Sequence, residues 1–279
     1  MKVKIALQWL SGCEGCEVAL LDSFNLLLGK IQRGEAEIVY APLLLDVEDY
    51  DCADTTIVTG SIRTAADERR VKKAREKSGA LIAFGSCACF GGIHGLADLA
   101  DIGAVGEKTG RIPSETRLKE AVDPVWRVVK TDAAIPGCPP PRHMIDNFLE
   151  NMLSPSTADH GKTVCDECLR RRSEDRKITG LRRDLTGVDD SRCLLDQGIP
   201  CIGFAVSSGC GALCPKVNYP CHGCMGFSED IEGQDRGVAR AVSALASILE
   251  PDVVEEALKD PVGFFMKFTY PSFKLRRKR

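Results

Sequence analysis

The first half of the chain alternates short apolar segments with longer amphipathic ones. Five runs are rich in aliphatic or β-branched residues, and each ends near a glycine or another turn residue, which predicts strands. They are KVKIALQWL at 2–10, AEIVYAPLL at 36–44, TTIVTGS at 55–61, ALIAFGS at 80–86 and VVKTDAAIPG at 128–137. Helical spacing of apolar residues over Glu17–Leu28, and the charged segment TAADERRVKKAREKSG at 64–79, predict helices between the strands.

This alternation indicates an α/β fold with a parallel sheet and helices on both faces, similar to the flavodoxin type. Ligands of such sheets gather at the carboxyl ends of the strands. Three cysteine-containing loops fall at that edge, namely SGCEGC at 11–16, FGSCACFGG at 84–92 and IPGCPPP at 135–141. We therefore expect a flavodoxin-like domain over residues 1–153 with a ligand site at this edge.

The pattern changes after Leu153. Residues 154–227 contain eight cysteines, many glycines and charged residues, and little sustained periodicity. A helix with one apolar face is predicted over 236–249, and the apolar tail PVGFFMKFTYPSF is expected to pack against another surface. Because metal ligands can order loops that a small core cannot, we expect residues 154–279 to form a loop-rich, metal-binding second domain.

Composition and charge narrow the range of possible functions. The chain has 279 residues, 44% of them hydrophobic and 28% charged, with a net charge of −3, which argues against a dedicated nucleic-acid binder. Only KLRRKR at 274–279 is strongly basic, and we expect it to be a solvated tail or a docking edge for an acidic partner subunit. No apolar run reaches membrane-spanning length and no leader pattern is evident, so a cytoplasmic location is expected.

Fourteen cysteines are many for a cytoplasmic chain, where disulfides are disfavoured and clustered thiols more often bind metal or carry out redox chemistry. Their spacing divides twelve of them into three groups of four. The groups are Cys13, Cys16, Cys87 and Cys138; Cys165, Cys168, Cys193 and Cys201; and Cys210, Cys214, Cys221 and Cys224. For the first group, an iron-sulfur or tetrahedral zinc site is favoured over a redox dithiol, because glycines flank the cysteines and allow close backbone approach.

Two cysteines fall outside the groups. Cys52 has no partner nearby in the sequence, and Cys89 would face away from Cys87 if the preceding strand continued. We expect Cys89 to be a packing residue and Cys52 a small residue without a ligand role.

Seven cysteine-containing motifs, in this order and with these gaps, resemble the small electron-transferring subunit of nickel-iron hydrogenases. The similarity is strongest to the cytoplasmic, archaeal-type subunits of the methyl-viologen-reducing (deazaflavin-non-reducing) enzymes, with the deazaflavin-reducing enzymes as an alternative. The motifs are SGCEGC, GSCACFGG, IPGCPPP, VCDEC, CLLDQGIPC, GCGALCP and PCHGC.

The resemblance implies three 4Fe-4S clusters, one for each cysteine group. The first group would bind the proximal cluster, the second the distal cluster and the third the medial cluster. Periplasmic relatives have histidine where this chain has Cys165, and they bind a 3Fe-4S medial cluster that lacks a counterpart of Cys214. Implied partners are a large subunit that holds the nickel-iron centre, and an iron-sulfur or flavin acceptor subunit linked to heterodisulfide reductase, which would place the protein in methanogenesis.

No residue of this chain is expected to split hydrogen. Glu14 and Glu17 are candidates for a proton path near the first group, although a charged residue at a helix start is an equally good interpretation. We expect His94 to be structural and His222 to be a donor beside a ligand or a surface residue. Two alternatives remain: a zinc-stabilised scaffold or binding module, and the related subunits of complex I and of NAD-linked hydrogenases, which resemble only the first half.

Overall fold

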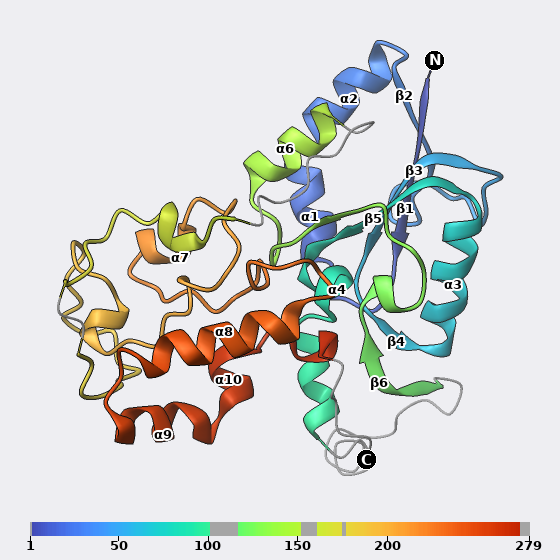
Figure 1. Ribbon diagram of the computed structural model, residues 1–279. Helices are drawn as coiled ribbons and strands as arrows, with labels where there is room; N and C mark the ends of the chain where they lie inside the picture. Colours follow the sequence, from blue (N-terminus) through green and yellow to red (C-terminus); the bar gives the residue numbers. More distant parts are fainter. Residues whose placement is uncertain (1, 101–116, 152–160, 175–176, 274–279) are drawn as a thin grey trace. The chain divides into compact units, whose positions relative to one another are not determined.

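The computed structural model describes residues 2–100, 117–151, 161–174 and 177–273, which form two compact units (Figure 1). The first unit contains Met1–Thr157 and Tyr270–Ser272, and the second contains Ala158–Thr269 and Phe273–Arg279. The expected domain boundary after Leu153 and the basic tail KLRRKR both lie outside the described residues.

The first unit is organised by a five-stranded parallel sheet with the order β2-β1-β3-β5-β7. Its strands are β1 (Val3–Trp9), β2 (Ala36–Tyr40), β3 (Ala53–Thr59), β5 (Ser78–Phe84) and β7 (Ala133–Ile135). Each of the five predicted runs overlaps one of these strands, and the strand order is that of flavodoxin-like sheets. The predicted α/β fold class is therefore confirmed.

Three helices cover one face of the sheet, as Figure 1 shows: α1 (Gly15–Asp22), α2 (Phe24–Gln32) and α6 (Arg142–Glu150). Strand residues such as Ile5, Ile57 and Phe84 point to this face and form its core with Leu20 of α1 and Phe148 of α6. The sequence predicts one helix over Glu17–Leu28, whereas the structure has two, because the helical hydrogen-bond pattern is interrupted at Ser23, between α1 and α2.

The opposite face is covered by α3 (Ala65–Glu76), which buries Val71 and Ala74. A reciprocal capping box starts this helix. The Thr64 hydroxyl accepts from the Asp67 amide at 3.0 Å, and the Asp67 carboxylate accepts from the Thr64 amide at 2.8 Å. Beside α3, β4 (Ile62–Thr64) and β6 (Leu118–Asp123) form an antiparallel pair that the sequence pattern does not predict.

After β5 the chain continues as α4 (Gly85–Phe90) and the 3-10 helix η1 (Ile93–Leu99), and a second 3-10 helix, η2 (Val125–Arg127), precedes β7. The 3-10 turn Tyr270–Ser272 packs against these elements. The Arg127 guanidinium donates to the carbonyls of Pro271 at 2.7 Å and Ser272 at 3.0 Å, and the Ser272 hydroxyl donates to the Phe90 carbonyl at 3.0 Å. This part of the apolar tail therefore belongs to the first unit.

The second unit contains short helices and loops. Its helices are η3 (Val164–Asp166), η4 (Leu195–Gln197), α7 (Leu213–Lys216), α8 (Gln234–Ala246), α9 (Pro251–Lys259) and α10 (Pro261–Phe265). The predicted helix over 236–249 corresponds to α8, which buries Val238, Ala241 and Leu245. Strand-like pairing in the described part of this unit is confined to isolated bridges such as Thr163 with Ser207.

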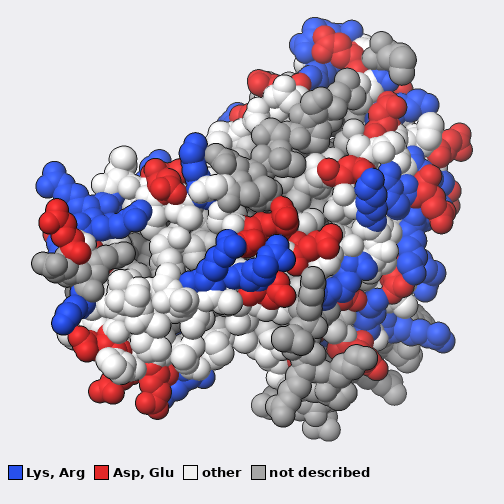
Figure 2. All heavy atoms as spheres, viewed as in Figure 1, with Lys and Arg blue, Asp and Glu red and all other residues white. Residues whose placement is uncertain are grey.

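No helix among the described residues is long and apolar enough to cross a membrane. Acidic and basic side chains are mixed on the face seen in Figure 2 and do not gather into one patch of a single sign. This mixed surface agrees with the nearly balanced charge of the chain, 37 Lys and Arg against 40 Asp and Glu.

Candidate metal centres

The first cysteine group meets at the carboxyl edge of the parallel sheet. Cys13 and Cys16 follow β1 at the start of α1, Cys87 lies in α4 after β5, and Cys138 follows β7. Burial, together with the neighbouring Cys138 and Cys13 thiols, raises the pKa of the Cys87 thiol to about 12. Burial, Glu17, Cys87 and Cys138 likewise raise the pKa of Cys16. The four thiols are therefore close enough to interact electrostatically.

Two glycines allow these thiols to face one another. Gly85 has a φ of +84°, and a β-carbon there would collide with the Cys16 sulfur. Gly92 has a φ of +64°, and a β-carbon there would lie 2.5 Å from the Cys87 sulfur. Larger residues would meet both a strained backbone and an occupied volume, so the backbone forms a close-fitting wall around the first group.

Cys87 is a candidate ligand and Cys89 a packing residue, but strand alternation is not the reason for this difference. The strand does not continue through these residues, because β5 ends at Phe84 and both cysteines lie in α4. Cys89 is fully buried, and its thiol donates to the Ala83 carbonyl at 3.3 Å. Its own carbonyl accepts from the Trp126 indole at 3.0 Å. These contacts are those of a packing residue.

The second group lines one small cavity in the second unit, formed by Cys165, Cys168, Cys193 and Cys201 with Arg170 and Arg172. The net effect of burial, of Arg172, which lowers the pKa, and of the other three thiols, which raise it, is a pKa of about 12 for Cys165. The sequence separates these cysteines by up to 36 positions, and the loops bring them together.

The third group consists of Cys210, Cys214 in α7, Cys221 and Cys224. Burial and then the Cys201 thiol of the second group raise the pKa of Cys221 well above its usual range, and Cys224 and Cys210 add to this shift. Cys214 in turn contributes to the raised pKa of Cys210. Backbone amides donate to sulfur here, from Ala212 and Leu213 to Cys210 and from Gly223 to Cys221. Such donors favour a thiolate over a thiol.

Direct contacts join the second and third groups. The Cys221 amide donates to the Cys201 sulfur at 3.3 Å. The Glu167 carboxylate, which lies between Cys165 and Cys168, accepts from the amides of Gly209 and Gly211 at 2.9 Å each, on either side of Cys210. Glu167 therefore fixes one cysteine loop against another.

Arg170 connects further loops of the same region. Its guanidinium donates to the carbonyls of Pro215 at 3.0 Å, Asp189 at 2.8 Å and Arg192 at 2.9 Å, and to the side chain of Asn218. The sequence analysis missed both Arg170 and Glu167, because their partners lie up to 48 positions away. The one available signal was their position, Glu167 within a CxxC pair and Arg170 two residues after it.

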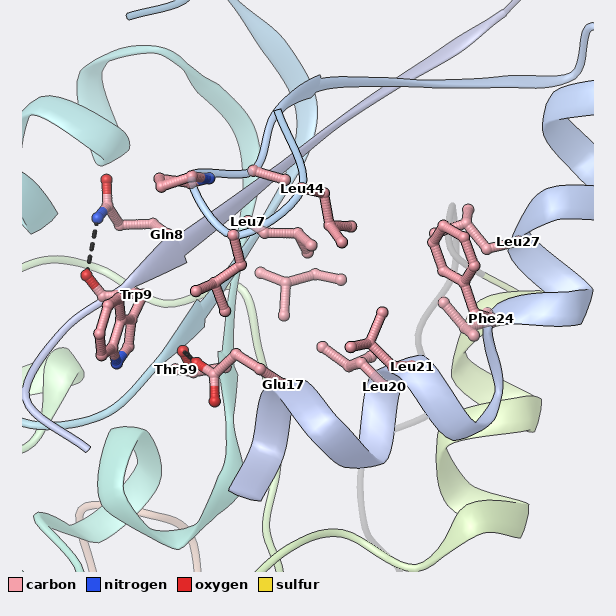
Figure 3. A pocket seen from close by; sticks show the side chains of 15 residues that line it. Leu7, Gln8, Trp9, Glu17, Leu20, Leu21, Phe24, Leu27, Leu44 and Thr59 are labelled. Atoms are coloured by element: carbon pink, nitrogen blue, oxygen red, sulfur yellow. Dashed lines mark hydrogen bonds between the residues drawn. The ribbon is translucent and has the colours of Figure 1, made fainter. Parts of the chain in front are cut away.

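Glu14 and Glu17 differ in their surroundings. Glu14 is exposed and has a left-handed backbone with φ of 64° at the start of α1. The Glu17 carboxylate accepts a hydrogen bond from the Thr59 hydroxyl, at one end of an apolar pocket that α1, α2 and β1 line (Figure 3). Leu20, Leu21 and Phe24 supply much of the wall of this pocket.

The two singled-out histidines lie in different units. His94 lines an open cavity of the first unit, whose wall also includes Ser11 and Gly12. His222 has its Nδ1 3.3 Å from the Lys267 ammonium and stands edge-on to the Tyr219 ring. Burial and then Lys267 lower the pKa of His222 to about 4. The interpretation of His222 as a polar neighbour of the third group agrees with these contacts.

The donor sets suit iron-sulfur clusters in kind, since each group offers four thiols, and backbone amides donate to several of the sulfurs. All fourteen cysteines are free of disulfide bonds. Within the described residues, no three His, Cys, Asp or Glu side chains are already arranged around a point where a single metal ion would sit.

Comparison with known proteins shows to which protein family the chain belongs. The family model described as NADH ubiquinone oxidoreductase, 20 Kd subunit, matches residues 13–152. A subunit of the F420-non-reducing vhu hydrogenase of Methanocaldococcus jannaschii is 36% identical over 291 residues, covering 100% of this chain and 98% of the relative. The iron-sulfur subunit of the F420-non-reducing hydrogenase of Archaeoglobus profundus is 31% identical over 310 residues, covering 97% and 95%.

A solved structure supports the fold. A chain of an NAD+-reducing [NiFe]-hydrogenase in the H2-reduced state superposes with a TM-score of 0.52 at 24% identity, covering 57% of this chain and 97% of that chain. The molecule is thus the small subunit of a hydrogenase, which is part of an oxidoreductase complex. It belongs to the family that includes these subunits of the archaeal F420-non-reducing hydrogenases, as the seven motifs predict.

Proposed function

We propose that this chain transfers electrons through three 4Fe-4S clusters between a hydrogen-activating large subunit and a distal acceptor. The observation that carries the proposal is the close placement of cysteine thiols in both units, where neighbouring thiols raise one another's pKa values. Each cluster, when bound, would accept and release single electrons. The residues of the chain would hold the clusters, limit the access of water and tune the potentials by hydrogen bonds to sulfur.

The proposed ligand sets follow the three groups. Cys13, Cys16, Cys87 and Cys138 would hold the proximal cluster, Cys165, Cys168, Cys193 and Cys201 the distal cluster, and Cys210, Cys214, Cys221 and Cys224 the medial cluster. The amides of Ala212, Leu213 and Gly223 favour thiolate at the third set, so they would raise its reduction potential relative to a set without such donors. The contact between Cys221 and Cys201 supports close placement of the second and third sets.

A large subunit that holds the nickel-iron centre is the proposed partner of the first unit. Its contact surface would lie beside the first cysteine group, where α1 exposes apolar side chains. Val18 is 57% exposed and Leu21 is 44% exposed on this helix, and Leu43 on a neighbouring loop is 50% exposed. Apolar side chains gathered beside a ligand loop fit a surface that a partner covers.

Finer parts of the proposal rest on the motifs and the relatives. They are a cytoplasmic location, an iron-sulfur or flavin acceptor subunit, a link to heterodisulfide reductase and a role in methanogenesis. Of the two proton-path candidates, Glu17 is the better placed, because its carboxylate lies beside Cys16 and accepts from Thr59. Glu14 points from an exposed turn and carries less support.

Purification of the native complex tests the function. We expect a nickel-containing partner to co-purify, about twelve iron atoms and as many sulfides per small subunit, and hydrogen-dependent reduction of a viologen dye. A Cys52→Ser variant should match the wild type in all three, because Cys52 is exposed and outside the groups. A colourless protein with stoichiometric zinc would support the scaffold alternative. Clusters without nickel or hydrogenase activity would contradict the proposed function.

A further inference from the structure

Two side chains of opposite charge lie beside cysteines of the second unit. Arg172 and Glu167 both come from the segment that carries Cys165 and Cys168, so both are sequence neighbours of the second cysteine group. The fold nevertheless places them at different groups. Arg172 lines the cavity of the second group, whereas the Glu167 carboxylate is bound to the loop of the third.

The Arg172 guanidinium is held at the second group by geometry. It donates to the Cys165 carbonyl at 3.1 Å, and the side chain lines the same small cavity as the four thiols. After burial, which raises the pKa of Cys165, Arg172 has the next largest effect on that pKa and lowers it. A cation at this position therefore favours negative charge on the second group.

The Glu167 carboxylate is held at the third group in a similar way. Its two oxygens accept from the amides of Gly209 and Gly211 at 2.9 Å each, and these two residues flank Cys210. After burial, which raises the pKa of Cys210, and two backbone amides, which lower it, Glu167 has the next largest effect and raises it. An anion at this position therefore disfavours further negative charge on the third group.

The two groups are direct neighbours in the fold. The backbone amide of Cys221, in the third group, donates to the Cys201 sulfur of the second group at 3.3 Å. A single backbone hydrogen bond thus connects a candidate ligand of one group to a candidate ligand of the other. A difference in charge between their surroundings acts across this short connection.

Reduction of an iron-sulfur cluster adds one negative charge, so a nearby cation raises its reduction potential and a nearby anion lowers it. We propose that Arg172 and Glu167 create a potential step between the two groups, in which Arg172 raises the potential of the second and Glu167 lowers that of the third. The step favours the passage of one electron from the third group to the second, and no bond forms or breaks. This inference rests on the proposed function and adds the direction in which the two side chains bias it.

The two contributions differ in size. Glu167 is half-buried and bound by two amides, whereas Arg172 is exposed, so water and salt screen the charge of Arg172 more strongly. We therefore expect the larger effect on potential from Glu167. Both side chains act through charge, so a substitution that keeps the charge should keep most of the effect.

A redox titration of the purified complex, followed by low-temperature electron paramagnetic resonance, measures the midpoint potentials. Cys193→Ser and Cys214→Ser identify the signals of the second and third groups. Glu167→Gln should make the third group about tenfold easier to reduce at a given potential, a rise of about 59 mV for one electron. Arg172→Gln should make the second group about threefold harder to reduce.

Matched variants separate charge from a loss of structure. Arg172→Lys and Glu167→Asp keep the charge and should have midpoints close to those of the wild type. Arg171→Gln and Glu256→Gln remove the same charges at exposed positions of the second unit and should shift neither midpoint. If Glu167→Gln loses iron from the third group, the Arg172 variants alone decide the outcome.

Intact clusters with unmoved midpoints in Arg172→Gln and Glu167→Gln would overturn this proposal and leave the proposed function standing. Equal shifts in the charge-keeping and charge-removing variants would also overturn it, because the effect would then come from structure and not from charge. A wild type that holds no iron would overturn both proposals. Opposite shifts confined to the charge-removing variants would support the potential step.

Discussion

The two units of this protein reach an ordered structure by different means. The first has a five-stranded parallel sheet with packed apolar residues, including Ile5, Ile57 and Phe84 at 1% exposure or less. The described part of the second has isolated bridges, short helices and eight cysteines instead. A sheet core is specified by periodic apolar residues, whereas a loop-rich unit depends on ligands and on a few long-range polar contacts.

Polar side chains of the second unit take the place that strand pairing has in the first. Arg170 and Glu167 connect loops by charge-assisted hydrogen bonds to backbone groups. Gln234 is fully buried and accepts from the Phe227 amide at 2.7 Å, which holds α8 to the loop after Cys224. Each of these side chains orders a segment by supplying a hydrogen-bond partner to its backbone groups.

Removal of iron should produce the largest difference in stability between the two units. After chelation under reducing, anaerobic conditions, we expect amides in 163–227 to lose most of their hydrogen-exchange protection, because ligand binding can supply about 10 kcal/mol or more of folding free energy. Amides of β1, β3 and β5 should stay protected. An untreated sample serves as the control. Equal loss in both units would contradict the distinction.

The substitution Ile57→Ala should instead destabilise the first unit. Ile57 is 1% exposed in the sheet core, and its truncation should lower the free energy of unfolding of the first unit by about 2–5 kcal/mol. Urea unfolding followed by hydrogen exchange of the sheet amides measures the change. Leu21→Ala, at a 44% exposed position, should cost far less. If Ile57→Ala also lowered the iron content of the second and third cysteine groups, the two units would not have independent cores.

Arg170→Ala should weaken the second unit alone. It removes donors to three carbonyls and to Asn218, which we expect to cost about 2–4 kcal/mol and to lower the protection of amides in 189–193 and 214–219. Arg171→Ala is the control, because its side chain is exposed one position further on. If both variants behave alike, Arg170 does not connect the loops as described.

The smallest expected effect depends on pH and belongs to the first unit. Hydrogen bonds from Lys119 and Lys72 lower the pKa of Glu68 from 4.5 to about 2. The folded state therefore binds fewer protons than the unfolded state between these values, and the contribution of Glu68 is lost as the pH falls from about 4.5 to about 2. Since Glu68 is about a third exposed, Glu68→Gln should cost only about 0.5–1 kcal/mol at pH 7.

Urea midpoints of wild type and Glu68→Gln across this range provide the measurement. The difference between the two proteins should shrink as the pH approaches 2. A difference that is constant with pH would show that the two lysines do not stabilise the ionised carboxylate. Glu76→Gln, at the end of the same helix, provides a comparison variant.

Sequence periodicity predicted the sheet well because its signal is local. Each predicted apolar run overlaps a strand, and the glycine-flanked loops lie at the expected edge. The antiparallel pair of β4 and β6 was missed, since short strands far apart in sequence carry no alternating pattern strong enough to be seen. The break at Ser23 was also missed, because apolar spacing continues across it.

The sequence predicts a grouping of the cysteines but not the contacts that order their loops. The division of twelve thiols into three sets by spacing and motif order stays a prediction, because Cys221 of the third set interacts with Cys201 of the second set as well as with Cys224 and Cys210. Arg170, Glu167 and Gln234 act on partners that only the folded chain brings near. A single sequence without a structure carries no signal for such contacts.

Cys214→Ser is the most direct test of the three-set account, because Cys214 distinguishes a four-thiol third set from a three-thiol one. In the purified complex, iron and sulfide analysis with low-temperature electron paramagnetic resonance should show loss of about one to four iron atoms and an altered signal from one cluster only. Cys52→Ser should match the wild type. An unchanged iron count and spectrum in Cys214→Ser would contradict the account.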